Sequence, residues 1–352
     1  MANKWASKLQ RFEGFVNPEL VPENNCIKTP SPSLNWAFGV KGHGLPLGHT
    51  MLLGGPAKAG KSFIALNMVA QLHKDDPEAI VVVFNTEYRA GAQANKNTLS
   101  KLGIDPERFF SFDTNSPDQI FDRIANDYNA MCQEGMPLKL IIIDSLSGIQ
   151  GRRSMNSDTI MQQQIGDEAA TIGVGMKMII PVIRKHNIAM ILCTHVRDEM
   201  DQHEIMRGNK VRLQAANAVK HYSEFFCMVE RNKTKAGRQT MAGEDFIDEE
   251  VKDLMGKGDV TGHKIRFKIL DSSLGVNGRT GEFTLDFERG IINQHEEIFQ
   301  MGLNTGVITK PNLQTYQFGD ETWRGLANAL QSVKDNPALQ EEILKKVYEL
   351  DK

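Results

Sequence analysis

The stretch GPAKAGKS at residues 55–62 constrains the fold of this chain more than any other segment. It follows an apolar run, MLLGG at 51–55, that predicts a buried strand, and it opens SFIALNMVAQLHK at 62–74, whose apolar spacing predicts a helix. A strand, a glycine-containing turn and a helix, in that order, form the context in which GxxxxGK[ST] makes a phosphate-binding loop. We therefore expect this segment to bind the phosphates of a nucleotide.

The chemistry of such a loop predicts what its residues do. Glycines let the backbone curl around an anion with its N–H groups pointing inward, and the following helix adds the positive end of its dipole. Lys61 is expected to reach the β- and γ-phosphates of ATP, and the Ser62 hydroxyl is expected to bind Mg²⁺. The predicted nucleotide-binding residues are Gly55, Pro56, Ala57, Lys58, Ala59, Gly60, Lys61 and Ser62.

Apolar runs continue to alternate with helical patterns after this loop. Runs at 79–87, 138–145 and 188–195 predict further strands, whereas 116–133 and 175–187 predict helices. The strands are apolar along nearly their whole length, which indicates burial on both faces. The sequence therefore predicts an α/β fold in which helices cover a mostly parallel central sheet.

Composition excludes several classes of protein. The chain has 352 residues, of which 40% are hydrophobic and 24% charged, as in ordinary globular proteins. No apolar run is long enough to span a membrane and the N-terminus lacks a signal-peptide core, so we expect a cytoplasmic protein, in the host cytoplasm if it is viral. The four cysteines lie far apart without CxxC spacing and are expected to be reduced thiols. The net charge of −3 leaves any DNA binding to local basic patches.

Polar side chains stand at the ends of three predicted strands. Asp144 ends LIIID, where a carboxylate at the edge of a doubly wound sheet can hold Mg²⁺; the alternative is a loop cap. Glu87 ends VVVFNTE and is the candidate general base that orients the attacking water, unless it is only a solvated strand end. His195 ends IAMILCTH, where it either senses the γ-phosphate or is a structural histidine.

Taken in order with the phosphate loop, these strand ends resemble the RecA family of recombination ATPases. The resemblance runs from IKTPSPSLNWAFGVKGHGLPLG through FNTE and KLGIDPERFF to WRGLANALQSVKDNPALQEEILKKVYEL near the C-terminus. Stretches such as IIIDSLSGI, HNIAMILCTHVRDEMD and MGLNTGVITKPNLQTY are most similar to the bacteriophage UvsX-type branch. The resemblance implies a RecA-like ATPase core that forms a helical filament on single-stranded DNA and also engages double-stranded DNA. It further implies ATP bound between subunits, and single-strand-binding and mediator proteins as additional partners.

The resemblance also divides the chain into three parts. Residues 1–25 would be a short N-terminal oligomerisation segment, 26–275 the ATPase core, and 276–352 a small α/β C-terminal domain. The first part has apolar residues at helical spacing, and these pack either on a neighbouring subunit or on the protein's own core. They are Trp5, Leu9 and Phe12.

The resemblance implies two DNA-binding loops, one after the strand that ends at Asp144 and one after the strand that ends at His195. The first covers about 148–170, with Arg152 and Arg153 as its basic candidates, and the second covers about 196–217. The candidates in the second loop are Met206, Arg207, Lys210 and Arg212. Cations neutralise phosphates without reading sequence, and an apolar side chain can wedge between bases. Both loops also contain acidic residues, so charge alone would favour two mobile polar loops with incidental arginines.

Other positions depart from the family pattern. HKIRFKIL offers Arg266 and Lys268, but Leu270 stands where a second lysine is expected, so Lys268 is assigned the contact with a neighbouring subunit's ATP. No residue in 88–98 matches the adenine-stacking tyrosine, which leaves the adenine contact unassigned. The tail is not strongly acidic, so autoinhibition by the tail is not implied. The predicted catalytic residues are Glu87, Lys61, His195 and Lys268.

The leading hypothesis is therefore an ATP-dependent DNA recombinase that promotes homologous pairing and strand exchange in recombination and repair. A hexameric DNA helicase uses the same core, although helicases usually carry a long N-terminal domain and only about 25 residues precede the core here. The third hypothesis is an ATP-binding filament mediator with little turnover. The presence of Glu87 and Asp144 argues against that inactive class.

Overall fold

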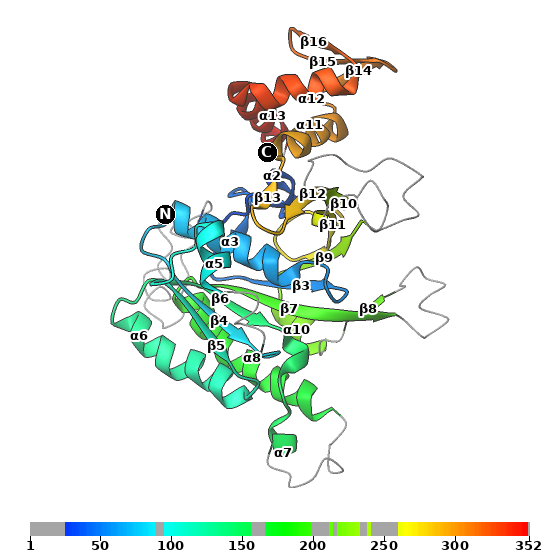
Figure 1. The fold of residues 1–352 in the computed structure, drawn as a ribbon. Coiled ribbons are helices and arrows are strands. Elements are labelled where there is room, and N and C mark those ends of the chain that lie inside the picture. The colour runs from blue at the N-terminus through cyan, green and yellow to red at the C-terminus, as the bar shows by residue number, and fades with distance from the viewer. Residues whose placement is uncertain are drawn as a thin grey trace, which may run out of the picture.

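The structure is a computed structural model that describes residues 25–88, 95–155, 166–198, 211–213, 217–232, 238–240 and 260–350. Its larger part is built on one extended sheet, and its C-terminal part is a smaller unit of helices with a separate sheet (Figure 1). The predicted N-terminal helix, with Trp5, Leu9 and Phe12, lies outside the described residues. Within those residues no helix is both long and apolar enough to cross a membrane.

The central sheet has a parallel middle and an antiparallel extension. Its parallel strands are β3 (Thr50–Gly55), β4 (Ile80–Asn85), β5 (Phe109–Asp113), β6 (Leu138–Asp144), β7 (Ala189–Asp198) and β9 (Phe225–Arg231). Its antiparallel strands are β8 (Val211–Leu213), β10 (Arg238–Thr240), β11 (Val260–Ser272), β12 (Thr280–Asp286) and β13 (Gly290–Ile292). The main order is β13-β12-β11-β9-β3-β7-β6-β4-β5, with β10 beside β11 and β8 beside β7. This arrangement confirms the predicted α/β class with its mostly parallel sheet.

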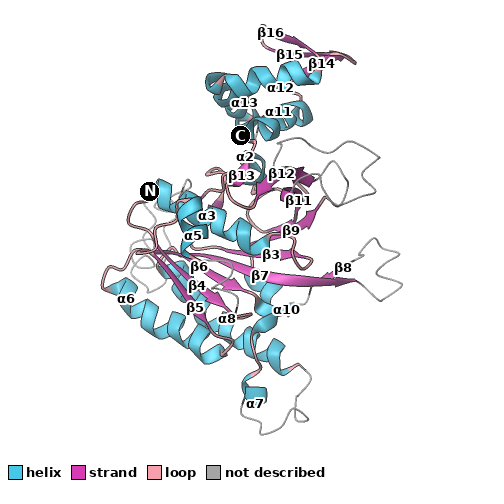
Figure 2. Ribbon diagram, viewed as in Figure 1, coloured by secondary structure: helices cyan, strands magenta, loops and turns pink. Residues whose placement is uncertain are grey.

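Helices cover both faces of this sheet (Figure 2). On one face lie α3 (Lys61–Asp75) and α5 (Lys96–Leu102). On the other lie η2 (Asp118–Tyr128), which has π-type hydrogen bonds, α8 (Asp167–Lys185) and α10 (Asn217–Tyr222). The shorter elements are β1 (Cys26–Ile27), α2 (Pro32–Ala37), β2 (Leu45–Pro46), α6 (Asn129–Gln133), η3 (Leu146–Gly148) and α7 (Arg152–Met155).

Alternate strand residues enter two separate apolar clusters, which explains the continuous apolar runs in the sequence. In β3, Leu53 belongs to the cluster beneath α3, and its neighbour Leu52 belongs to the cluster beneath α8. Ile142 and Ile143 of β6 divide in the same way, and all four side chains are buried. Successive side chains of a strand point to opposite faces, so a sheet covered on both sides needs apolar residues at every position.

Helix α8 begins at Asp167, eight residues before the predicted helix over 175–187. Its first half is rich in small residues, which weakens the apolar periodicity that sequence analysis relies on. The structure gives one reason for this composition. A Cβ atom added at Gly175 would overlap the ring of Phe121 in η2, so the two helices approach closely only because residue 175 is glycine.

The C-terminal unit has a core of its own. It contains α11 (Gln294–Thr305), β14 (Thr309–Asn312), β15 (Thr315–Phe318), β16 (Glu321–Arg324), α12 (Leu326–Asp335) and α13 (Pro337–Glu349). Its buried side chains run from Ile298 to Val347 and form one cluster around Phe299 and Trp323. β12 and β13 pair in register with the central sheet, so residues 280–292 belong to that sheet, and the division of the chain between 275 and 276 stays a prediction.

A buried carboxyl group joins this unit to the core. Glu297 of α11 is 4% exposed, and its Oε2 accepts hydrogen bonds from the hydroxyl groups of Ser31 at 2.5 Å and Ser33 at 2.6 Å. Both serines lie at the start of α2, and the backbone N–H of Ser33 also approaches Oε2 at 3.3 Å. Within the described part of the chain Oε1 has no hydrogen-bond partner. Burial, as the largest influence, raises the pKa of Glu297 to about 8.

This raised pKa predicts a specific dependence of stability on pH. Folding moves the pKa from 4.5 to about 8, so between these values the folded state keeps a proton that the unfolded state releases. The free energy of unfolding should therefore fall as pH rises through this window, by up to about 1.4 kcal/mol per pH unit, and level off above it. Glu297→Gln should lose this decline in denaturant titrations across the same window.

Glu342→Gln provides the matched control, because Glu342 of α13 is 57% exposed and lies 3.4 Å from Lys346. The quantity to compare is the difference in unfolding free energy between each variant and the wild type at each pH. Other groups that titrate in this range cancel in that difference. Parallel curves for wild type and Glu297→Gln would contradict the assignment.

Candidate nucleotide-binding site

The carboxyl ends of the parallel strands meet at one edge of the sheet and surround a cavity of about 370 Å³. The cavity is lined by Lys58, Ala59, Gly60, Lys61, Ser62, Phe63, Leu66, Glu87, Thr98, Asp144, His195 and Phe287. The strand-end residues predicted from the sequence are thus brought together with the phosphate loop. The remaining residues of the predicted loop, Gly55, Pro56 and Ala57, connect the end of β3 to this lining.

The backbone of the loop has the conformation that its glycines allow. Gly60 has a φ of 88° at the N-cap of α3, where a Cβ atom would lie 2.9 Å from the side chain of Leu285. A Cβ atom at Gly55 would overlap the carbonyl oxygen of Val229 in the adjacent strand. No side chain caps α3, so the N–H groups of its first turn are available to an anion. The loop therefore fits a nucleotide phosphate.

Lys61 lies at the centre of this loop. Its Nζ donates hydrogen bonds to the carbonyl oxygens of Gly55 and Pro56, each at 2.9 Å, and approaches Nδ1 of His195 at 3.4 Å. The residue is only 6% exposed, and burial lowers the pKa of its amine while Asp144 and Glu87 act in the opposite direction. The ammonium group is thus held between the loop backbone and the strand-end side chains.

The oxygen atoms that suit Mg²⁺ are also adjacent. The Ser62 hydroxyl donates a hydrogen bond to the carboxylate of Asp144. Burial raises the pKa of Asp144, and it outweighs this hydrogen bond and the charge of Lys61, which both lower that pKa. A hydroxyl and a carboxylate are hard donors that Mg²⁺ accepts, usually beside substrate phosphates and water. Among the described residues no group of three or more His, Cys, Asp or Glu side chains is arranged to hold a metal. The donor set therefore fits an ion that the substrate helps to bind.

Glu87 and His195 form a connected pair beside Lys61. Oε1 of Glu87 accepts a hydrogen bond from the Ser145 hydroxyl at 2.9 Å and lies 2.9 Å from Nε2 of His195. Because an ammonium group only donates, the contact of Lys61 with Nδ1 makes that nitrogen the acceptor. Nε2 then carries the hydrogen that His195 donates to Glu87. The imidazole is oriented at both nitrogens, and whether it also senses phosphate stays a prediction.

Four residues line the cavity without an assignment from the sequence, namely Phe63, Leu66, Thr98 and Phe287, and the last of these is an exposed aromatic side chain. Phe287 follows β12, is 48% exposed and packs its ring edge against His263 at a centroid distance of 5.2 Å. It has the same strand parity as Phe283 and Leu285, which are buried in the core. The available signal in the sequence was the alternation of apolar residues at 283, 285 and 287, which continues one residue past the end of β12. It could not show that the last ring faces the nucleotide cavity.

Lys268 does not line this cavity. It lies on β11, paired in register with Met228 and Thr280, and is exposed. Arg266, two residues earlier, pairs with Glu282 at 3.0 Å. The structure therefore leaves Lys268 on an open strand surface, and its predicted contact with a neighbouring subunit's nucleotide stays a prediction.

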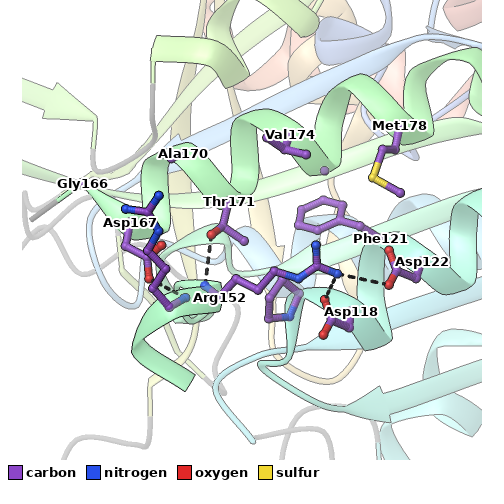
Figure 3. A pocket seen from close by; sticks show the side chains of 13 residues that line it. Asp118, Phe121, Asp122, Arg152, Gly166, Asp167, Ala170, Thr171, Val174 and Met178 are labelled. Atoms are coloured by element: carbon purple, nitrogen blue, oxygen red, sulfur yellow. Dashed lines mark hydrogen bonds and ion pairs between the residues drawn. The ribbon is translucent and has the colours of Figure 1, made fainter. Parts of the chain in front are cut away.

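The first predicted DNA loop begins beside a second cavity, of about 490 Å³, between η2 and α8 (Figure 3). The Arg152 guanidinium lies 2.5 Å from the carboxylate of Asp118 and 3.5 Å from that of Asp122. The backbone N–H of Arg153 donates to Asp167 at 3.0 Å. Both arginines are thus attached to the helices that flank the loop, and their contact with DNA stays a prediction.

The second predicted DNA loop is described only at its edges. Arg212 lies on β8, where its backbone is paired with Arg197 of β7 in an antiparallel ribbon that leaves the central sheet. Met206, Arg207 and Lys210 lie outside the described residues. Their predicted role in DNA binding is therefore not tested by the structure.

Comparison with known proteins agrees with the fold. The profile of the RecA N-terminal domain matches residues 19–292, well over half of the chain. Protein RecA of Paracoccus denitrificans is 24% identical over 335 residues, which cover 95% of this chain and 83% of that relative. The RecA proteins of Oleidesulfovibrio alaskensis and Streptomyces avermitilis are each 23% identical, over 92% of this chain and over 83% and 76% of their own lengths. The chain belongs to the RecA family.

Proposed function

We propose that this protein is an ATP-dependent DNA recombinase that assembles on single-stranded DNA and promotes homologous pairing and strand exchange. The observation that carries this proposal is the convergence of Lys61, Ser62, Asp144, Glu87 and His195 on one cavity in a chain of the RecA family. The relatives named RecA match more than nine tenths of this chain, which supports a role in recombination and repair.

Five side chains of the cavity and the loop backbone have distinct parts in the proposed hydrolysis of ATP. The loop backbone and Lys61 bind the phosphates, while Ser62 and Asp144 hold Mg²⁺, which when bound neutralises phosphate charge. Glu87 orients the attacking water and accepts its proton. His195 links Glu87 to Lys61, so a change at the phosphates can reach the segment that follows β7.

The proposal extends to the base of the nucleotide. Phe287 is the aromatic side chain exposed at the cavity wall, and a ring in that position can stack on the purine. Thr98 of α5 lines the same cavity and would contact the base or ribose. We assign the adenine contact, which sequence analysis left open, to Phe287.

The finer features of the proposal concern the assembly. A helical filament would place Lys268 near the nucleotide of the next subunit and the segment 1–25 on a neighbour. The loops at about 148–170 and 196–217 would face DNA, with Arg152, Arg153, Met206, Arg207, Lys210 and Arg212 as contacts. A member of the bacteriophage UvsX-type branch would also engage single-strand-binding and mediator proteins as further partners. A hexameric helicase and a mediator with little turnover are the alternatives that the experiments below distinguish.

Glu87→Gln should lower turnover by about 10²- to 10⁴-fold and spare nucleotide binding. The amide keeps the size of the side chain but cannot accept a proton, and a positioned general base contributes about 10²- to 10⁴-fold in rate. Phosphate release and binding of a fluorescent ATP analogue should be measured on the same preparations. Glu107→Gln is the control, since Glu107 is exposed and does not line the cavity. Unchanged turnover in Glu87→Gln would remove Glu87 from the mechanism.

Phe287→Ala should raise KM for ATP by about fivefold with little change in kcat, because base stacking of about 1 kcal/mol is lost before the chemical step. Phe287→Tyr keeps an aromatic face and should retain the wild-type KM. The two variants should be compared by steady-state phosphate release over a range of ATP concentrations. An equal KM in the alanine and tyrosine variants would exclude Phe287 as the stacking residue.

ATPase activity should rise when single-stranded DNA is added, and the ATP-bound protein should form open helical filaments in electron micrographs. Closed rings of fixed size would favour the helicase instead. Filaments with negligible turnover in the presence of DNA would favour the mediator. Absence of both DNA binding with an ATP analogue and stimulation by DNA would overturn the recombinase.

A further inference from the structure

Thr86 lies between the end of β4 and Glu87 and connects two neighbouring strand ends through its side chain. It is 3% exposed. Its hydroxyl donates to the carbonyl oxygen of Ser145 at 2.5 Å and accepts from the N–H of Ser145 at 2.9 Å. Its own backbone N–H donates to the carbonyl oxygen of Asp144 at 2.9 Å. One threonine therefore satisfies both backbone polar groups of the buried residue that follows Asp144.

These contacts replace a sheet ladder at the point where it ends. The pairing of β4 with β6 runs in register up to Asn85 and Asp144 and does not continue beyond them. Backbone polar groups buried past the end of a ladder still need partners. The Thr86 hydroxyl supplies both partners, so Ser145 is held at a fixed position relative to the backbone of residues 85–87.

Ser145 in turn holds the side chain that the proposed mechanism requires. Its hydroxyl donates to Oε1 of Glu87 at 2.9 Å and lies 2.7 Å from the hydroxyl of Ser147. Thr86 is also packed against the next turn, because a Cβ atom at Gly148 would overlap its hydroxyl. The side chain of Thr86 is thus confined on both sides and cannot change partner without moving residues 145–148.

We propose that Thr86 is a positioning residue for Glu87, acting through Ser145. The inference rests on the proposed ATPase function and adds a residue that is not among those lining the nucleotide cavity. Loss of the Thr86 hydroxyl would free the backbone of Ser145, and with it one of the two donors, Ser145 and His195, that hold Oε1 of Glu87. Because a carboxylate that orients water must be held closely, this should lower the rate of hydrolysis rather than the affinity for ATP.

The experiment compares Thr86→Val, which keeps the shape and removes the hydroxyl, with Thr86→Ser, which keeps the hydroxyl. Thr86→Val should lower kcat about tenfold and change the dissociation constant of an ATP analogue less than twofold. Thr86→Ser should recover most of the wild-type kcat. Thr50→Val is the matched control. Thr50 is fully buried at the N-terminal end of β3, away from the phosphate loop, and its hydroxyl has no hydrogen-bond partner among the described residues.

A double-mutant comparison separates positioning from general damage to the fold. Combining Thr86→Val with Glu87→Gln should lower turnover no further than Glu87→Gln alone, because both act on the same carboxylate. Additive losses, an unchanged kcat in Thr86→Val, or a serine variant as slow as the valine variant would each overturn the inference. Wild-type turnover that is not stimulated by DNA, in a protein that does not bind DNA, would overturn the recombinase but leave this comparison intact, whereas absence of wild-type turnover would overturn both.

Discussion

The parallel register of β3, β7, β6 and β4 is the constraint on which the site depends. Gly55 is paired with His195, and Asn85 with Asp144, so the phosphate loop begins at the same level of the sheet as the polar strand ends. A parallel ladder sends every strand's carboxyl end to one edge, where the backbone pairing ends and side chains take over. The hydrogen bonds among Lys61, His195, Glu87 and Ser145 belong to that edge.

The same edge holds charges that the protein interior disfavours. Burial lowers the pKa of Lys61 and raises that of Asp144, and each of the two groups opposes the shift of the other. Neither charge is well solvated without a partner, and a buried unpaired charge is costly. A nucleotide with its metal ion would supply an anion beside the lysine and a cation beside the carboxylate. The arrangement is therefore suited to bind a charged ligand and not only to stabilise the fold.

Sequence patterns predicted the features whose cause is local. The phosphate loop, the parallel strands and the polar ends Glu87, Asp144 and His195 each depend on residues close in the chain, and the structure places all of them at one cavity. Features that depend on distant pairing could not be predicted. Phe287 reaches the cavity only because β12 joins the sheet through β11 and β9. The sequence did not predict the first turns of α8, because small residues in its first half weaken the apolar periodicity, and one of them, Gly175, is required by close packing against η2.

The acidic residues near the first proposed DNA loop can be understood from exposure. Arg152 is 56% exposed and its partners Asp118 and Asp122 are 51% and 40% exposed, so these pairs contribute only about 0–1 kcal/mol each. Such pairs orient the guanidinium without holding it strongly. A DNA backbone presents many closely spaced phosphates and releases counterions on binding, which can exceed a pairing of that size. Acidic neighbours are thus compatible with DNA binding by Arg152. The arginine would exchange its ion pair within the protein for a DNA phosphate, and the strength of that contact would depend on salt.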